Sequence, residues 1–206
     1  MRAIITAILL ASAAADTAAA ATIGEAKIAF SADRQLSIEG KIYDGKMWGM
    51  PGAERHEQNI NGIPAIFVLH RDTPLAEAVL PQMHTVVDFL LPPELKMFDD
   101  PRLKKRVIDQ ETVNGVPTTK YALTVDVPEG HGDGTMWMSD TGIPMKLDGQ
   151  FTKTNGKSGR LHWELTNVRI GPQPASLFTT PPGFTKLPAE AVAPLLGLQL
   201  KSAKAH

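Results

Sequence analysis

Cysteine is absent from the 206 residues of this chain. Its absence excludes a disulfide framework, a thiolate metal site and the lipid-modified cysteine of a bacterial lipoprotein. Aromatic residues make up only 6%, and 21 Lys and Arg nearly balance 22 Asp and Glu. With no long run of one charge, the sequence lacks the electrostatic footprint of a nucleic-acid-binding protein. A chain of this kind depends on an apolar core for its stability.

Catalytic motifs are missing as well. The sequence contains no cysteine nucleophile and no Gly-x-Ser-x-Gly turn, and no serine has a histidine placed by a recognisable local signature. We therefore expect no catalytic residue, no enzymatic activity and no cofactor.

Two groups of residues raise the question of a metal. Glu129, His131 and Asp133 alternate and would project to one side of an extended segment, but the glycines around them favour a solvated hairpin tip. Met136 and Met138 would offer two thioethers to Cu(I), although methionine is more often the filler of an apolar core. We predict no metal site at either place.

Residues 1–21 have the order of a secretory signal peptide. One positive charge at Arg2 precedes an apolar stretch from Ala3 to Ala15, and alanines up to Ala21 offer A-x-A cleavage sites. No other segment has the roughly 18 consecutive apolar residues of a membrane span. We expect a soluble periplasmic protein without a transmembrane anchor.

The most informative pattern lies between Glu111 and Pro188. Apolar and polar residues alternate in Tyr121 to Val127, in Ile143 to Asp148 and in Arg160 to Thr166, which is the period of a half-buried strand. Turn signals separate the runs, namely Asn114-Gly115, the glycine-rich 129–134, Asp140-Thr141-Gly142 and Asn155-Gly156. The segment is predicted to form an antiparallel meander with one apolar face.

The remaining segments are predicted in less detail. Leu36, Ile38 and Ile42 alternate toward a hairpin turn at Asp44-Gly45, and Ile60 to His70 has apolar residues on both faces, as a covered central strand would. Leu75 to Leu91, punctuated by Pro81, fits either a helical turn or strands. Glu94 to Phe98 would form a short helix. Residues 189–206 form a tail, either a short helix or a frayed end.

Several of these segments resemble a known superfamily. They are Glu111 to Tyr121, Met136 to Lys146, Leu177-Phe178 and Pro182-Gly183-Phe184. They look like the second half of LolA/LolB-like periplasmic proteins, and the resemblance covers Ile28 to Pro188. It implies a mainly β (α+β) fold, a curved antiparallel incomplete β-barrel with one or two short covering helices, whose apolar cavity takes acyl chains.

The chain also departs from that superfamily. Its aromatic content is low, it lacks the lipidated cysteine of the membrane-anchored members, and Arg55 only roughly matches the position of an arginine that such proteins often carry. We divide the chain into a signal peptide at 1–21, a half-barrel domain at 22–188 and the tail.

These observations lead to two functional hypotheses. In the first, the protein binds an acyl chain, a lipid or a lipoprotein on the apolar face of the sheet. The ligand-binding residues would be Tyr121, Leu123, Val125, Met145, Leu147, Phe151, Leu161, Trp163 and Leu165. In the second, the protein is an interaction or sensor module of the cell envelope that contacts a protein partner through strand edges or hairpin tips.

Overall fold

About two thirds of the described residues lie in β-strands. The computed structural model describes residues 26–73, 75–90 and 102–196. In chain order its strands are β1 (Phe30–Ile38), β2 (Lys41–Met50), β3 (Ala53–Ile60), β4 (Ile63–His70), β5 (Leu75–Leu80), β6 (Thr85–Leu90), β7 (Lys104–Val113), β8 (Val116–Val127), β9 (Gly130–Met138), β10 (Pro144–Lys153), β11 (Ser158–Ile170) and β12 (Thr185–Pro188). Two 3₁₀ helices, η1 (Pro81–Met83) and η3 (Ala175–Phe178), and the α-helix α2 (Ala189–Leu196) accompany them.

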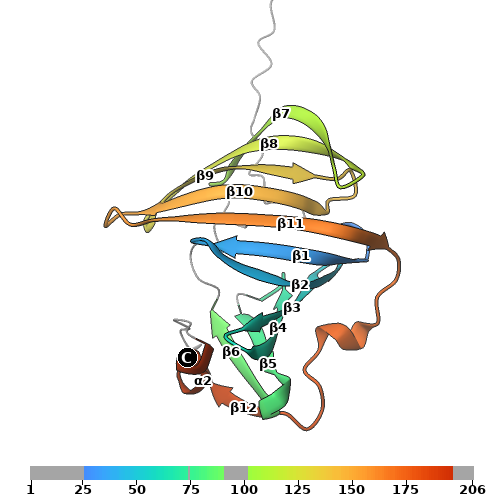
Figure 1. Cartoon of the computed structure of the whole chain (residues 1–206), viewed down its shortest axis with the longest axis vertical. Helices are drawn as coiled ribbons and strands as arrows, with labels where there is room; N and C mark the ends of the chain where they lie inside the picture. The colour runs from blue at the N-terminus through green and yellow to red at the C-terminus, as the bar shows by residue number, and fades with distance from the viewer. Residues whose placement is uncertain (1–25, 74, 91–101, 197–206) are drawn as a thin grey trace, which may run out of the picture.

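The twelve strands form one sheet in the order β12-β6-β5-β4-β3-β2-β1-β11-β10-β9-β8-β7. Two meanders, β1 to β6 and β7 to β11, are joined by the antiparallel pairing of β1 with β11. Strand β12 is the exception, because it runs parallel to β6. The sheet is strongly curved and stays open, with β12 and β7 at its two ends (Figure 1). The predicted mainly β, curved and incomplete barrel is thus confirmed.

Successive side chains of each strand point to opposite faces of the sheet. We call inner the face on which Tyr121, Met136, Leu147 and Trp163 lie, each opposite the next across β8, β9, β10 and β11. The other face is the outer face. Leu36 of β1 lies opposite Trp163, so the inner face continues without interruption into the first meander.

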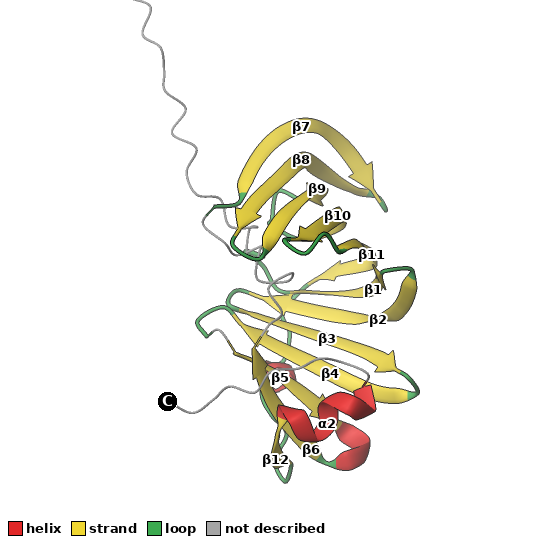
Figure 2. Ribbon diagram, turned by 90° about the vertical axis from the view of Figure 1, so that its left-hand side faces the viewer, coloured by secondary structure: helices red, strands yellow, loops and turns green. Residues whose placement is uncertain are grey.

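Part of the first meander is covered on both faces. On the inner face, Ala189 and Val192 of α2 pack against a buried cluster that includes Ala65 (Figure 2). On the outer face, Phe178 of η3 packs against Val68. Strand β4 therefore has buried side chains on both sides, as the run from Ile60 to His70 predicts.

The hairpin turn predicted at Asp44-Gly45 is wrong. Strand β2 runs straight through these residues, and the chain reverses at Glu39 and Gly40, whose φ angles are 52° and 81°. Gly45 is needed for a different reason. A Cβ there would lie 1.9 Å from the carbonyl oxygen of Glu57, so only glycine allows β3 to approach β2 this closely.

The ambiguous segment Leu75 to Leu91 is resolved as strands up to Leu90, with Pro81 opening η1 between β5 and β6. The turn at Asn114-Gly115 is confirmed, with φ angles of 49° and 82°.

Residues 189–196 form helix α2. The predicted signal peptide, the predicted helix at Glu94 to Phe98 and residues 197–206 lie outside the described residues. Within residues 26–73, 75–90 and 102–196, none of the helices combines the length and the apolar character of a membrane span.

Candidate functional site

All nine predicted ligand-binding residues lie on the inner face of β8, β10 and β11. Six are buried, namely Leu123, Val125, Met145, Leu147, Phe151 and Leu165, and Tyr121, Leu161 and Trp163 are half-buried. They belong to two adjoining apolar clusters, and Trp163 packs against both. The structure thus brings the predicted residues together as one continuous apolar strip.

Most of the described contacts of the strip come from the sheet itself, and the exceptions are Leu103, Ile143, Ala26 and Ile28. In the cluster that holds Leu123 and Leu147, every described member belongs to β8, β9, β10 or β11, except Leu103 just before β7. The first meander differs, because α2 forms a second layer over it. The cavity beside the strip measures only about 10 Å³, room for about one water molecule, and is lined by Leu103, Leu123, Val125, Leu147, Gly132, Asp133, Gly134 and Gly149.

A buried polar cluster lies on the inner face at the end of this strip. Arg34 of β1 is 5% exposed, its Nη1 lies 3.0 Å from Nδ1 of His56, and its Nη2 donates to Oε1 of Gln58. Nε2 of His56 lies 3.3 Å from Oε2 of Glu54, and Arg71 donates to the other oxygen of Glu54 at 2.8 Å. The chain of contacts crosses from β1 to the end of β4.

The protonation states in the cluster follow from its geometry. Because a guanidinium only donates, Nδ1 of His56 must accept, which places the single ring proton on Nε2, toward Glu54. Burial lowers the pKa of His56, and the nearby Arg34 adds to that effect. Burial alone would raise the pKa of Glu54, but the hydrogen bond from His56 and the charge of Arg71 lower it to about 2. His56 is therefore neutral and Glu54 is ionised.

Two buried donors of the cluster have no partner in the described chain, Nε of Arg34 and Nε1 of Trp163. Both side chains contact His56. The rings of His56 and Trp163 meet edge to face with their centroids 5.7 Å apart. Buried donors without an acceptor are rare in native proteins and call for an explanation.

Sequence reasoning identified Trp163 but missed the polar residues beside it. The signal was present in the alternation of β1, where Arg34 follows Phe30 and Ala32 at an inward position. An arginine in an apolar register has to be paired or functional. Its partner His56 is 22 residues away, and no local pattern connects the two.

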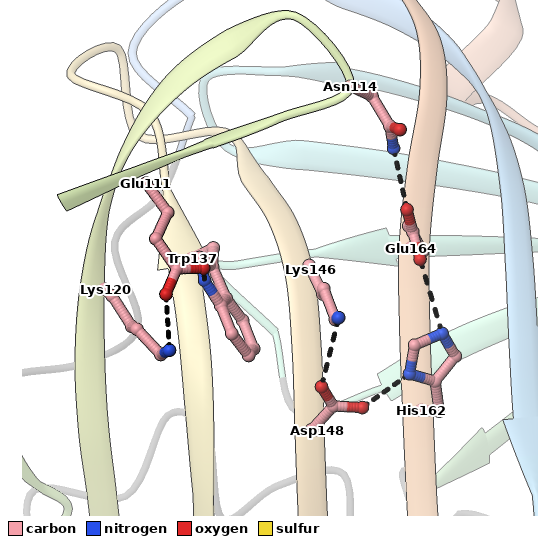
Figure 3. A network of polar contacts seen from close by, with 8 residues as sticks. All are labelled: Glu111, Asn114, Lys120, Trp137, Lys146, Asp148, His162 and Glu164. Carbon is pink, nitrogen blue, oxygen red and sulfur yellow. Dashed lines mark hydrogen bonds and ion pairs between the residues drawn. The ribbon is translucent and has the colours of Figure 1, made fainter. Parts of the chain in front are cut away.

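The outer face of the second meander is polar, and Lys120 and Lys146 are paired with carboxylates there. Nζ of Lys120 lies 2.5 Å from Glu111, and Nε1 of Trp137 donates to the same carboxylate at 2.7 Å (Figure 3). Nζ of Lys146 lies 3.5 Å from Asp148 and also 4.7 Å from the centroid of the Trp137 ring. These residues form a solvated, mutually satisfied surface, in contrast to the inner cluster.

The Glu129-His131-Asp133 segment does not gather into a metal site. Nδ1 of His131 lies 2.7 Å from Asp126 on the paired strand, and its Nε2 is 3.9 Å from Asp133. Across the described ranges, no three His, Cys, Asp or Glu side chains come together as potential ligands of one ion.

A wider groove of about 570 Å³ lies elsewhere, between the β2–β3 turn, the end of β4 and η3. It is lined by Met50, Pro51, Gly52, Ala53, His70, Arg71, Asp72, Ala175, Phe178 and Thr179. Nearby, Nη1 of Arg55 donates to the carbonyl oxygen of Leu177 at 2.8 Å, and this contact ties η3 to the outer face. Arg55 thus points away from the apolar strip.

Comparison with known proteins finds likeness in structure only. No protein-family model and no curated protein matches the chain. It is similar to an uncharacterised conserved protein from Thermus thermophilus, at 12% identity over 79% of this chain and 91% of that chain, with a TM-score of 0.49.

Two further solved structures resemble the chain. One is the MucA/MucB complex of Pseudomonas aeruginosa, at 17% identity with a TM-score of 0.45. The match covers 74% of this chain and 56% of the matched chain. The other is a LolA superfamily protein from Nitrosomonas europaea, at 7% identity with a TM-score of 0.42. The match covers 76% of this chain and 92% of that chain. Because these TM-scores lie below 0.5, the proposals below rest on residues of this chain.

Proposed function

We propose that this chain is a periplasmic protein that binds an acyl chain along the inner face of β8 to β11. The observation that carries the proposal is the apolar strip of nine residues, which lies on one face of the sheet and joins two apolar clusters. Apolar side chains with a few convergent polar groups beside them are typical of a ligand site. The resemblance of the sequence to LolA/LolB-like carriers points to the same class of ligand.

The composition of the strip suits a flexible chain. Gly132, Gly134 and Gly149 occupy inner-face positions opposite one another or opposite apolar residues, and all three line the small cavity. Where a glycine replaces a side chain, the sheet has a shallow depression. The buried Met136 and Met145 beside it are unbranched and adapt to irregular shapes. A bound chain would widen the cavity by moving such side chains.

Filling the depression tests the proposal. A Cβ on Gly149 would meet only the carbonyl oxygen of Asp133, at 3.6 Å, which is an ordinary contact. Gly149→Val should therefore fold and should weaken dodecanoate binding at least tenfold in calorimetry. Gly171→Val is the matched control, since a Cβ there would have open space around it. Equal affinity of the two variants would contradict the assignment of the site.

Native mass spectrometry tests the proposal independently of any variant. Full-length protein purified from the periplasm should carry adducts with the masses of single-chain or double-chain lipids. A protein that carries no lipid and binds no dodecanoate would refute the proposed function. Recovery of the protein from the cytoplasm would refute the proposed location.

The second candidate function is a contact with an envelope protein through the edge strand β7. This strand ends the strand order and exposes Val107 (58%) and Ile108 (41%). However, a register shift between Val107 and Asp109 and the charged Lys104 and Lys105 are features by which edge strands resist pairing. Crosslinking that persists in folded Leu123→Ser protein unable to bind dodecanoate would favour this candidate.

A further inference from the structure

Among the residues that the structure describes, none places a counter-charge in contact with the buried guanidinium of Arg34. Its hydrogen-bond partners in the described chain are His56 and Gln58, which are both neutral. Glu54 contacts His56 and not Arg34 in this network. Its carboxylate is already paired with Arg71 at 2.8 Å. Burying an unpaired charge is strongly unfavourable unless another group compensates it.

The unused donors of Arg34 and Trp163 belong to two side chains that contact the same residue, His56. Nε of Arg34 and Nε1 of Trp163 are both buried and, in the described chain, both without a partner, and each side chain contacts His56. Two unpaired donors on side chains that contact one histidine, one donor being charged, would suit an oxygen atom that carries negative charge. The site lies where the apolar strip ends, because Trp163 packs against the apolar clusters of the strip.

We infer that Arg34 and Trp163 bind the carboxylate of a fatty acid whose hydrocarbon chain lies along the inner-face strip. This inference rests on the proposed function and adds the chemical class of the ligand and its direction. Nε of Arg34 and Nε1 of Trp163 would each donate to the carboxylate. The hydrocarbon would run from Trp163 over Leu147 toward Leu123. The ligand thus supplies the negative charge that Arg34 lacks.

The experiment compares dodecanoate with dodecanol, which has the same chain and no charge. Binding of each to the full-length protein is measured by calorimetry at neutral pH. Wild-type protein should bind dodecanoate at least tenfold more tightly than dodecanol. In Arg34→Met, dodecanoate affinity should fall at least tenfold while dodecanol affinity changes less than twofold, because only the carboxylate uses the guanidinium.

Two further variants keep the test decisive. Arg160→Met is the matched control, because Arg160 is exposed on the same sheet and faces outward. It should bind both compounds like wild type. If Arg34→Met does not fold, Trp163→Phe removes one donor and keeps the ring, and it should weaken dodecanoate binding about threefold to tenfold while sparing dodecanol.

The outcomes separate this inference from the proposed function. Equal binding of dodecanoate and dodecanol by wild type, or equal losses for both in Arg34→Met, would overturn the carboxylate site and leave acyl-chain binding intact. Binding of neither compound by wild type would refute both. Dodecanoate affinity unchanged in both Arg34→Met and Trp163→Phe would show that the unpaired donors bind water only and would overturn the inference.

Discussion

Neutralising Glu54 should make the protein less stable at neutral pH and nearly as stable as wild type in acid. The network lowers the pKa of Glu54 from 4.5 to about 2, although burial opposes the change. At 1.36 kcal/mol per pKa unit, the difference corresponds to about 3 kcal/mol of stability. Because the side chain of Glu54 is only 17% exposed, solvent screening reduces this value little. Glu54→Gln mimics the protonated side chain and should lose this amount at pH 7.

The pH dependence has a defined sign. A carboxyl with a lowered pKa in the folded state stabilises the fold above its unfolded value of 4.5, and the contribution disappears as the pH falls toward about 2. Urea unfolding of wild type and Glu54→Gln should therefore differ by about 3 kcal/mol at pH 7 and by about 1 kcal/mol near pH 3. A difference that is the same at both pH values would refute the ion-pair network around Glu54.

Two further contrasts test the packing of the sheet. Trp137→Phe loses a hydrogen bond to a carboxylate on the outer face and should cost about 1 kcal/mol in urea unfolding. Trp163→Phe loses no hydrogen bond within the described chain and should cost less than about 0.5 kcal/mol. Equal losses would contradict the unpaired state of Trp163. Gly49→Ala would place a Cβ 2.2 Å from the buried ring of Phe30, so it should cost about 1–3 kcal/mol, while Gly171→Ala, in open space, should be neutral. A neutral Gly49→Ala would contradict the close packing of β2 on Phe30.

Local patterns predicted most of the second meander, but the turn predicted at 129–134 is wrong from Gly130 onward, because these residues belong to β9. The alternation in Tyr121 to Val127 sets the face of each side chain, and Asn114-Gly115 supplies the positive φ angles of a two-residue turn. Both signals act within a few residues, so the structure confirms them. The nine predicted residues therefore share one face, although the sequence alone does not show what they bind.

Long-range contacts explain what the sequence did not predict. Gly45 resembles a turn residue, but it is required by the approach of Glu57 from the next strand. The pairing of β1 with β11 joins segments more than 100 residues apart, and it brings Arg34 beside Leu165. The polar cluster of the candidate site arises only from this pairing and from the β2–β3 register, so no local motif could reveal it.

Methyl NMR of the methionines tests the central claim most directly, because these residues lie on both sides of the sheet. Met136 and Met145 are buried beside the proposed acyl-chain path, whereas Met50 borders the groove near η3 and Met83 is exposed at η1. Titration of the full-length protein with dodecanoate should shift the methyl resonances of Met136 and Met145 and leave those of Met50 and Met83 unchanged. Saturable shifts confined to Met50 or Met83, or no shift at all, would contradict binding on the inner face.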